Sequence, residues 1–364
     1  MKAAVLHEPN APLQFENVSL RKPRSHEVLL RTSFAGICHA DLHYMEAQTP
    51  HPMPVVLGHE SSGIVEEVGD EVRYVRPGDR VVTCLSVFCG TCEYCTTGRP
   101  ALCFDPEVKL PPGGSDRLQW DRPGRVHTFM NLSSFAEQML VHENALVKVR
   151  EDMPLDRASL VGCAVMTGYG SVVNTAKVGP GDTVAVIACG GVGMAAVNSA
   201  RIAGAERIIA IDISADKLEL SRKLGATDIV NPVDGDVVNQ VMELTGRGVD
   251  HALDCLGSKR TAEDAFKMLA FDGTATLVGL FREGETIELT GSDFLRERKV
   301  QGSLLGSNRF RVDMPRIIEL YMQGRMNLDS FISQKIRLND INDGFAAMRD
   351  GKVLRSLIDF GTSQ

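Results

Sequence analysis

The chain has 364 residues, 43% of them hydrophobic, which predicts about two globular domains and excludes a disordered, collagen-like or coiled-coil protein. Its formal net charge of −8 argues against binding to nucleic-acid phosphates, and no uninterrupted apolar stretch is long enough to cross a bilayer. The N-terminal residues lack the apolar run of a secretion signal, so we expect a cytoplasmic protein with no membrane or nucleic-acid partner. Its nine cysteines are then expected to be metal ligands or free thiols.

The first part of the chain is expected to be rich in β-structure. Short segments of alternating hydrophobicity, such as 27–31, 63–68 and 80–83, are separated by Pro-Gly and Gly-Asp turn signals. From residue 183 the pattern changes, and apolar strand candidates alternate with helix-like segments at 192–203 and 217–224. These strand candidates are 183–188, 207–211, 228–230, 249–255 and 274–280. Such alternation predicts a parallel sheet covered by helices on both faces.

The end of the chain returns to a mixed pattern. Helices are expected near 315–322 and 341–349, followed by a closing strand at 355–360. We therefore divide the chain into residues 1–164, residues 165–304, and a segment 305–364 that rejoins the first domain.

Four cysteines lie close together in the first domain: Cys89, Cys92, Cys95 and Cys103. Four thiolates at this spacing can surround one tetrahedral zinc, and because they fill every position the zinc would be structural. Gly90 and Gly98 allow the short loops to turn around it. An iron–sulfur cluster and a set of unligated thiols are the alternatives.

A second possible metal site is dispersed along the chain. Cys38 lies in the segment 36–43, His59 lies in Gly58-His59-Glu60 at a turn entering a strand candidate, and Cys163 follows Gly162. Two cysteines, one histidine and an open position form the donor set of a catalytic zinc. Spacing alone indicates this site only weakly, since each of these residues is more often structural.

A glycine-rich turn follows the strand candidate at 183–188 and begins a helix. The motif is nearly G-x-G-x-x-G, with Ala188 in place of the first glycine, and contains Gly190, Gly191 and Gly193. Such a turn places backbone N–H groups and the positive end of a helix at a diphosphate. Asp212, at the end of the next strand, would accept the adenosine ribose hydroxyls and repel a 2′-phosphate, which favours NAD over NADP.

Taken together and in this order, these motifs resemble the zinc-containing, medium-chain alcohol dehydrogenase family over nearly the whole chain. The motifs are Gly58-His59-Glu60, the four-cysteine lobe, Gly162-Cys163 ahead of Thr167-Gly168, and the glycine-rich turn. The resemblance implies an α/β fold with a doubly wound parallel (Rossmann) nucleotide-binding domain and a β-rich GroES-like catalytic domain carrying the zinc lobe. It implies an enzyme that interconverts an alcohol and an aldehyde or ketone, with two zinc ions and NAD.

The resemblance also assigns roles to single residues. It implies a catalytic zinc on Cys38, His59 and Cys163, with Glu60 as an alternative ligand and Asp41 as the acceptor behind His59. It implies cofactor contacts for the following residues: His39 and Arg355 at the pyrophosphate, Lys217 at the ribose, Thr167 and Val192 at the nicotinamide. It further implies a homodimer paired along an edge strand at 300–305.

One position departs from the family pattern. His43 matches a histidine that relays the alcohol proton to the surface, but Ala40 replaces the hydroxyl that connects the substrate to it, and a methyl group cannot carry a proton. A water molecule in that space would keep alcohol chemistry intact. Alternatively, the enzyme reduces an activated C=C bond, or the protein binds NAD and zinc without catalysis. Leu85, where the family often has an aromatic residue, is expected to line the substrate pocket.

Overall fold

The computed structural model describes residues 1–361, which form two compact units. The first unit contains Met1–Cys163, Arg309–Met322 and the described residues from Leu328 onward, and the second contains Ala164–Asn308 and Gln323–Asn327. The domain roles assigned to the sequence ranges stay predictions. No helix among residues 1–361 is long and apolar enough to span a membrane.

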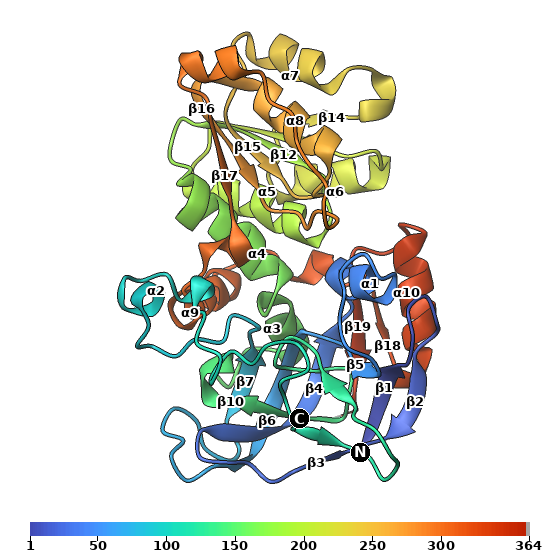
Figure 1. Ribbon diagram of the computed structural model, residues 1–364. Helices are drawn as coiled ribbons and strands as arrows, with labels where there is room; N and C mark the ends of the chain where they lie inside the picture. The colour runs from blue at the N-terminus through green and yellow to red at the C-terminus, as the bar shows by residue number, and fades with distance from the viewer. Residues whose placement is uncertain (362–364) are drawn as a thin grey trace. The chain divides into compact units, whose positions relative to one another are not determined.

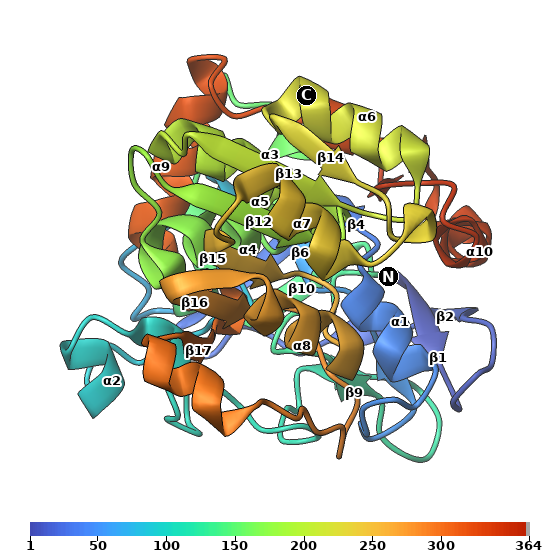
Figure 2. The same ribbon diagram turned by 90° about the horizontal axis from the view of Figure 1, so that it is seen from above.

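The second unit is built on a six-stranded sheet in the order β14-β13-β12-β15-β16-β17, and every adjacent pair is parallel (Figures 1 and 2). Its strands are β12 (Thr183–Ile187), β13 (Arg207–Ile211), β14 (Asp228–Val230), β15 (Val249–Asp254), β16 (Leu269–Leu277) and β17 (Lys299–Gly302). Numbered along the chain, this order is 3-2-1-4-5-6, the doubly wound arrangement in which a dinucleotide binds beyond the carboxyl ends of the central strands.

Helices connect these strands and lie against the sheet. They are α4 (Ala164–Gly170), α5 (Gly191–Ala203), α6 (Ala215–Leu224), α7 (Val237–Thr245) and α8 (Lys259–Lys267), with a π-helical segment at Ser171–Ala176. The strands are short apolar runs, and their buried side chains, such as Ala185, Ile209 and Ala252, form the core of this unit. Local signals set the helix ends: the Ser214 hydroxyl accepts the Lys217 N–H at the start of α6, and Gly204 ends α5 at φ 91°.

The edge strand is shorter than the expected segment 300–305. β17 ends at Gly302, and Leu304–Ser307 form a 3₁₀ turn in which Gly306 has φ 73°. A Cβ at Gly306 would lie 2.7 Å from the Thr167 carbonyl oxygen, so the backbone there is held in a left-handed turn against α4 and cannot continue the strand.

The first unit is β-rich. Its main sheet has the order β11-β7-β6-β4-β19-β18, with β10 also pairing with β4. The strands are β4 (Glu27–Gly36), β6 (Glu60–Val68), β7 (Arg80–Thr83), β10 (Gln138–His142), β11 (Leu146–Lys148), β18 (Gln334–Ile336) and β19 (Ser356–Asp359). Because β19 pairs antiparallel with β4, the C-terminal segment completes the sheet that the N-terminal segment begins.

Two smaller sheets and five helices complete this unit. The sheets are β2-β1-β5-β9 and β3-β8, made from β1 (Lys2–Leu6), β2 (Gln14–Asn17), β3 (Ser19–Leu20), β5 (Val55–Val56), β8 (Leu118–Gln119) and β9 (His127–Thr128). The helices are α1 (His39–Met45), α2 (Glu93–Thr96), α3 (Leu155–Val161), α9 (Phe310–Met322) and α10 (Ile341–Arg349). Helix α9 begins before the expected start at Pro315 and includes this proline, and the Asp313 carboxylate accepts the Arg309 N–H just before its first residue.

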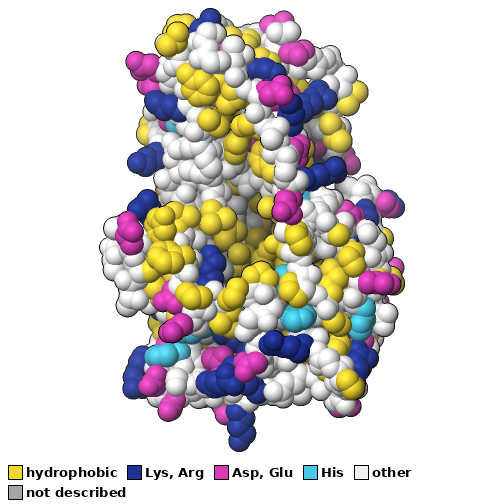
Figure 3. All heavy atoms as spheres, viewed as in Figure 1, with side chains coloured by type: hydrophobic (Ala, Val, Ile, Leu, Met, Phe, Trp, Pro, Cys, Tyr) yellow, Lys and Arg dark blue, Asp and Glu magenta, His cyan; other side chains and the backbone are white. Residues whose placement is uncertain are grey.

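On the face drawn in Figure 3, basic and acidic side chains are interspersed, without a large patch of one sign.

Candidate functional site

Three residues from separate segments of the first unit meet in its interior. Cys38 lies at the N-cap of α1, His59 directly precedes β6, and Cys163 follows α3. The side chains are 8%, 1% and 6% exposed, and one donor atom from each lies within 4.8 Å of the other two. Two thiols and an imidazole buried at this separation match the donor set of a zinc site with one open position.

Asp41 orients two of the three members of this triad, Cys38 and His59. Its fully buried carboxylate accepts the Nδ1 proton of His59 at 3.0 Å, the Gly58 N–H at 3.1 Å and the Cys38 N–H at 3.1 Å. The contact to Nδ1 leaves His59 Nε2 as the nitrogen available to a metal. One carboxylate thus orients both segments that carry the first two ligands.

The electrostatics of the triad suit a cation. The hydrogen bond from Cys163 and the nearby Arg355 guanidinium hold the pKa of Cys38 well below its usual value, against the effect of burial. The hydrogen bond to Cys38 and burial raise the pKa of Cys163. Burial lowers the pKa of His59, but the Asp41 carboxylate raises it well above the ordinary value. These directions describe Cys38 as a buried thiolate beside a protonated Cys163 and a protonated His59. A doubly charged metal ion would neutralise this thiolate.

Glu60 and Arg355 form a buried ion pair beside the triad. Arg355 Nε lies 3.2 Å from Glu60 Oε1, and the Arg355 guanidinium also donates to the Ile37 carbonyl at 2.8 Å. A Cβ at Gly36 would lie 2.2 Å from Glu60 Oε1, so the carboxylate fits only because residue 36 is glycine. Burial acts to lower the pKa of Arg355, but Glu60, Cys38 and Cys163 outweigh burial and raise this pKa above its ordinary value. The expected pyrophosphate contact of Arg355 therefore stays a prediction, because its guanidinium faces Glu60 in this structure.

Helix α1 carries the residues expected to move the proton. Ala40 is in its first turn and His43 one turn later, on the same face of the helix. His43 is half-buried, whereas His39 at the start of the helix is exposed. Helix α1 therefore has no hydroxyl at position 40, between its N-cap Cys38 and His43.

The four-cysteine lobe has the dimensions of a zinc site. All four sulfur atoms lie within 4.8 Å of one another, and the Cys89–Cys95 and Cys92–Cys103 pairs are both 3.9 Å apart. Zinc–sulfur bonds of about 2.3 Å in a tetrahedron require sulfurs about 3.8 Å apart. The N–H groups of Thr91 and Cys92 donate to Cys89 Sγ at 3.4 and 3.2 Å. Cys89, Cys92, Cys95 and Cys103 thus fit one zinc ion.

The glycine-rich turn of the second unit begins α5 at the carboxyl end of β12. Ala188 adopts φ 70°, the strained backbone expected where a non-glycine residue replaces the first glycine. A Cβ at Gly193 would lie 2.0 Å from the Ala188 carbonyl oxygen, so helix and strand approach closely only at a glycine. Around Gly190 nothing lies within 4 Å of such a Cβ. The turn therefore leaves space for a ligand, and Gly191 and Val192 lie in the first turn of α5.

Asp212 and Lys217, which are expected to contact the adenosine ribose of NAD, both follow the carboxyl end of β13. The Asp212 carboxylate accepts the Cys189 N–H at 2.7 Å and the Ser214 N–H at 2.9 Å, one on each oxygen. Each oxygen keeps a second lone pair for a ribose hydroxyl. Lys217 lies in the first turn of α6, partly exposed.

Thr167 lies in α4 and is almost completely buried. Its Oγ1 has no hydrogen-bond partner among the described residues. Such a hydroxyl has a donor and an acceptor left for a ligand, which fits the predicted contact with the cofactor.

A cavity of about 330 Å³ lies beside the four-cysteine lobe, whose Cys103 lines it, and the sequence predicted only part of its lining. The expected Leu85 lines it, but Tyr44, His51, Lys109 and Phe129 were not assigned to it from the sequence. They belong to short loops and to α1, where neither periodicity nor spacing identifies a lining residue.

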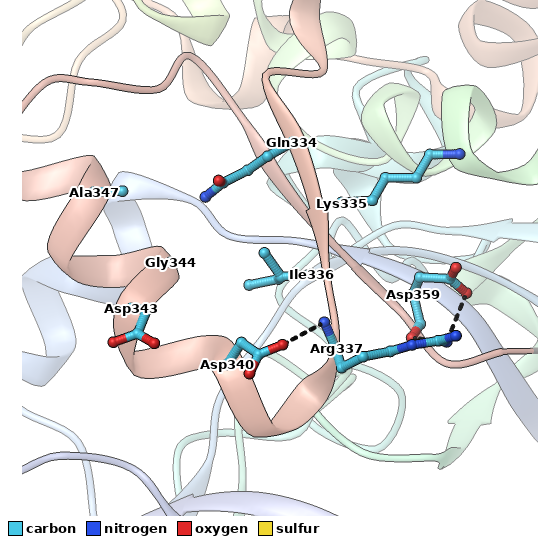
Figure 4. Close-up of a pocket in the computed structure, with 9 residues that line it drawn as sticks. All are labelled: Gln334, Lys335, Ile336, Arg337, Asp340, Asp343, Gly344, Ala347 and Asp359. Carbon is cyan, nitrogen blue, oxygen red and sulfur yellow. Dashed lines mark hydrogen bonds and ion pairs between the residues drawn. The ribbon is translucent and has the colours of Figure 1, made fainter.

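A second cavity, of about 540 Å³, lies between α10 and β18 (Figure 4). Three of its charged residues interact: the Arg337 N–H donates to Asp340 at 3.2 Å, and the Arg337 guanidinium lies 3.7 Å from the Asp359 carboxylate. No residue of the metal triad, of the cysteine lobe or of the glycine-rich turn lines this cavity, so it is not the candidate site.

Comparisons with known proteins agree with both halves of the chain. Residues 24–151 match the alcohol dehydrogenase GroES-like domain, and residues 191–321 match the zinc-binding dehydrogenase family. The chain is 37% identical to an S-(hydroxymethyl)glutathione dehydrogenase from Synechocystis, over 99% of both chains, and 35% identical to alcohol dehydrogenase 1 from Trifolium repens, over 98% of this chain and 96% of that one. Benzyl alcohol dehydrogenase from Acinetobacter calcoaceticus superposes with a TM-score of 0.93 at 33% identity over 98% of each chain.

These matches cover nearly the whole chain and confirm the predicted fold, a Rossmann-type unit and a GroES-like unit with a four-cysteine lobe. Zinc and NAD are the cofactors typical of the family, as the sequence predicted. The chain belongs to the zinc-containing, medium-chain alcohol dehydrogenase family and is an oxidoreductase that interconverts alcohols with aldehydes or ketones.

Proposed function

We propose that the catalytic centre is the triad of Cys38, His59 and Cys163, and that it works with NAD bound at the glycine-rich turn of the second unit. The observation that carries this proposal is the burial of two thiols and one imidazole with donor atoms within 4.8 Å of one another. When bound, zinc supplies Lewis acidity at the substrate oxygen and NAD supplies the hydride acceptor. Cys89, Cys92, Cys95 and Cys103 would hold a second, structural zinc.

The surrounding residues orient the centre and balance its charge. Asp41 fixes the tautomer of His59 and the direction of Nε2. Glu60 carries a negative charge close to the cysteines, and Arg355 compensates it within the protein interior. Because Glu60 begins β6 and Arg355 directly precedes β19, this pair is fixed by the sheet, and Glu60 could act as an alternative ligand only by leaving Arg355.

The proton of the alcohol has to reach solvent past Ala40. His43 lies one helical turn beyond this residue and is half-buried, which suits an acceptor at the end of the route. We infer that a water molecule occupies the space left by the missing hydroxyl. Ala40 also supports the second candidate, reduction of an activated C=C bond, in which the proton is delivered to carbon.

For the cofactor, we propose NAD rather than NADP, with Asp212 on the ribose hydroxyls and Lys217 beside them. Gly190, Gly191 and Gly193 would accommodate the pyrophosphate with His39 and Arg355, and Thr167 and Val192 would line the nicotinamide. The observation behind the preference is that Asp212 is fixed by two backbone N–H groups while a lone pair on each oxygen stays available.

We further propose a cytoplasmic homodimer. The support for the dimer is that β17 is the last strand of the six-stranded sheet and has unpaired backbone groups along one side, which a second copy could pair. A mass near two chains by light scattering is expected, and a mass near four would contradict it.

The test of the function is a panel of primary, secondary and aromatic alcohols, followed at the absorbance of the reduced nicotinamide with NAD and with NADP. Turnover of alcohols with NAD is expected, and it should be lost in Cys163→Ser. Reduction of enals without alcohol oxidation would favour the C=C reductase. Absence of both reactions in a protein holding only the lobe zinc would support a non-catalytic protein.

A further inference from the structure

In the second unit, helix α4 is packed between the first turn of α5 and the turn that follows β17. On one side, a Cβ at Gly168 would lie 2.4 Å from the Val192 carbonyl oxygen, so α4 touches the start of α5 directly. On the other side, a Cβ at Gly170 would lie 2.2 Å from the Gly306 carbonyl oxygen. Thr167, which is 5% exposed and whose Oγ1 has no hydrogen-bond partner among the described residues, is therefore held beside the glycine-rich turn.

Two unusual backbone segments meet at this place. In the turn after β17, Leu305, Gly306 and Ser307 have φ values of 50°, 73° and 47°. Left-handed residues other than glycine are uncommon, and such strain persists only where surrounding contacts hold it. Directly after α4, Ser171–Ala176 form a π-helix, a rare structure that is frequent at functional sites. The Asn174 amide donates to the Gly306 carbonyl at 3.3 Å, so the two segments are in contact.

The hydroxyl of Ser303 connects these segments. Ser303 is buried, and its Oγ lies 3.1 Å from Ser171 Oγ and 2.8 Å from Thr175 Oγ1. The Ser171 hydroxyl donates to the Thr167 carbonyl at 2.7 Å, and because it has only one proton, Ser303 is the donor to Ser171. The Ser303 N–H donates to the Leu277 carbonyl at 2.9 Å, which fixes Ser303 to the end of β16. A line of hydrogen bonds thus runs from the sheet through Ser303 and Ser171 to Thr167.

We propose, on the basis of the NAD-dependent function proposed above, that Ser303 is a positioning residue for the nicotinamide end of the cofactor. Through Ser171 it fixes the backbone of Thr167, whose unpartnered hydroxyl gains a hydrogen bond when a ligand supplies one. A contact that is ordered before binding costs the ligand less free energy than one that must be ordered on binding. Within residues 1–361, neither Ser303 nor Ser171 bonds to Asp212 or to the glycine-rich turn, so its effect is confined to the nicotinamide end.

The experiment compares two ligands, NADH and ADP-ribose, of which only NADH contains nicotinamide. The affinity of each is measured by calorimetry in the zinc-loaded parent, Ser303→Ala, Ser171→Ala and the double variant. Each single variant should weaken NADH binding about fivefold and leave ADP-ribose binding unchanged. The double variant should lose no more than either single variant, because both substitutions break the same line of hydrogen bonds. Ser199→Ala, which changes a fully buried serine of α5 outside this line, is the matched control and should leave both affinities unchanged.

The outcomes separate this inference from the proposed function. If the parent and both single variants bind NADH equally well, the role of Ser303 is wrong while the proposed function stands. An equal loss of affinity for NADH and ADP-ribose would also overturn this role, because Ser303 would then stabilise the whole unit. If the parent binds neither ligand, the proposed cofactor site fails, and this inference fails with it. Circular dichroism checks the folding of each variant, and if Ser303→Ala does not fold, Ser171→Ala breaks the contact to Thr167 from the other end and gives the same comparison.

Discussion

Replacement of Asp41 by asparagine removes the group that orients the metal triad while it changes the size of the side chain very little. The Asp41 carboxylate accepts three N–H groups, from Cys38, Gly58 and His59, at 3.0–3.1 Å in a fully buried position. Asparagine offers one acceptor oxygen and an NH₂ group, so at least one of these N–H groups must face another donor. A hydrogen bond to a charged group contributes about 1.5–3 kcal/mol, and a buried donor without an acceptor adds to this loss.

The effect on the metal follows from the same contact. Removal of the partner of a metal-ligating histidine typically lowers metal affinity about 10- to 100-fold, which corresponds to about 1.4–2.7 kcal/mol. We therefore expect Asp41→Asn to lose the triad zinc at a chelator concentration 10–100 times lower than the parent does, and to keep the lobe zinc. Alcohol turnover should fall with the loss of that zinc and recover in part when zinc is added in excess.

The assay is titration with a zinc chelator, followed by elemental analysis, turnover and circular dichroism. Asp156→Asn is the matched control, because Asp156 is also buried in the first unit but pairs with Lys335 at 2.6 Å and contacts no member of the triad. This control should keep both zinc ions with parental affinity. An Asp41→Asn variant that folds and keeps both zinc ions with unchanged affinity would refute the role assigned to Asp41.

Three further predictions concern other parts of the molecule. Ala40→Ser should raise alcohol turnover, because it restores a hydroxyl between the substrate and His43. The control Ala40→Val, which adds no hydroxyl, should not raise it. Unchanged alcohol turnover in Ala40→Ser, together with strong enal reduction by the parent, would favour the C=C reductase. Asp212→Gly should raise the ratio of kcat/KM for NADP over NAD by about tenfold or more, because the charge that repels the 2′-phosphate is removed, and an unchanged ratio would contradict the cofactor assignment. Cys92→Ser should reduce the zinc content to one ion per chain and lower the Tm, and a variant that retains two ions would contradict the four-sulfur site.

The nucleotide-binding fold was predictable from the sequence because its signals are local. The strands β12 to β15 are short apolar runs that end in turn residues, and the predicted ranges agree with the structure to within a few residues. The strain at Ala188 was also predictable, since the residue occupies a glycine position of a known turn. The boundary of β17 was not, because it depends on the contact between Gly306 and the Thr167 carbonyl, which are far apart in the chain.

The site was only partly predictable. The resemblance to a family selected Cys38, His59 and Cys163, and spacing alone would not have joined them, because their meeting depends on how α1, β6 and α3 pack. The ion pair between Arg355 and Glu60 depends on the pairing of β19 with β4, which no local pattern indicates. Lys109 is in a loop without periodicity, so its place in the cavity follows only from the fold.

The most direct test of the proposed catalytic centre is anomalous diffraction at the zinc absorption edge from crystals of the parent protein. The predicted result is two peaks per chain, one surrounded by the four lobe sulfurs and one at about 2.0–2.3 Å from Cys38 Sγ, Cys163 Sγ and His59 Nε2. A single peak at the lobe, in protein that oxidises alcohols with NAD, would contradict the assignment of the triad.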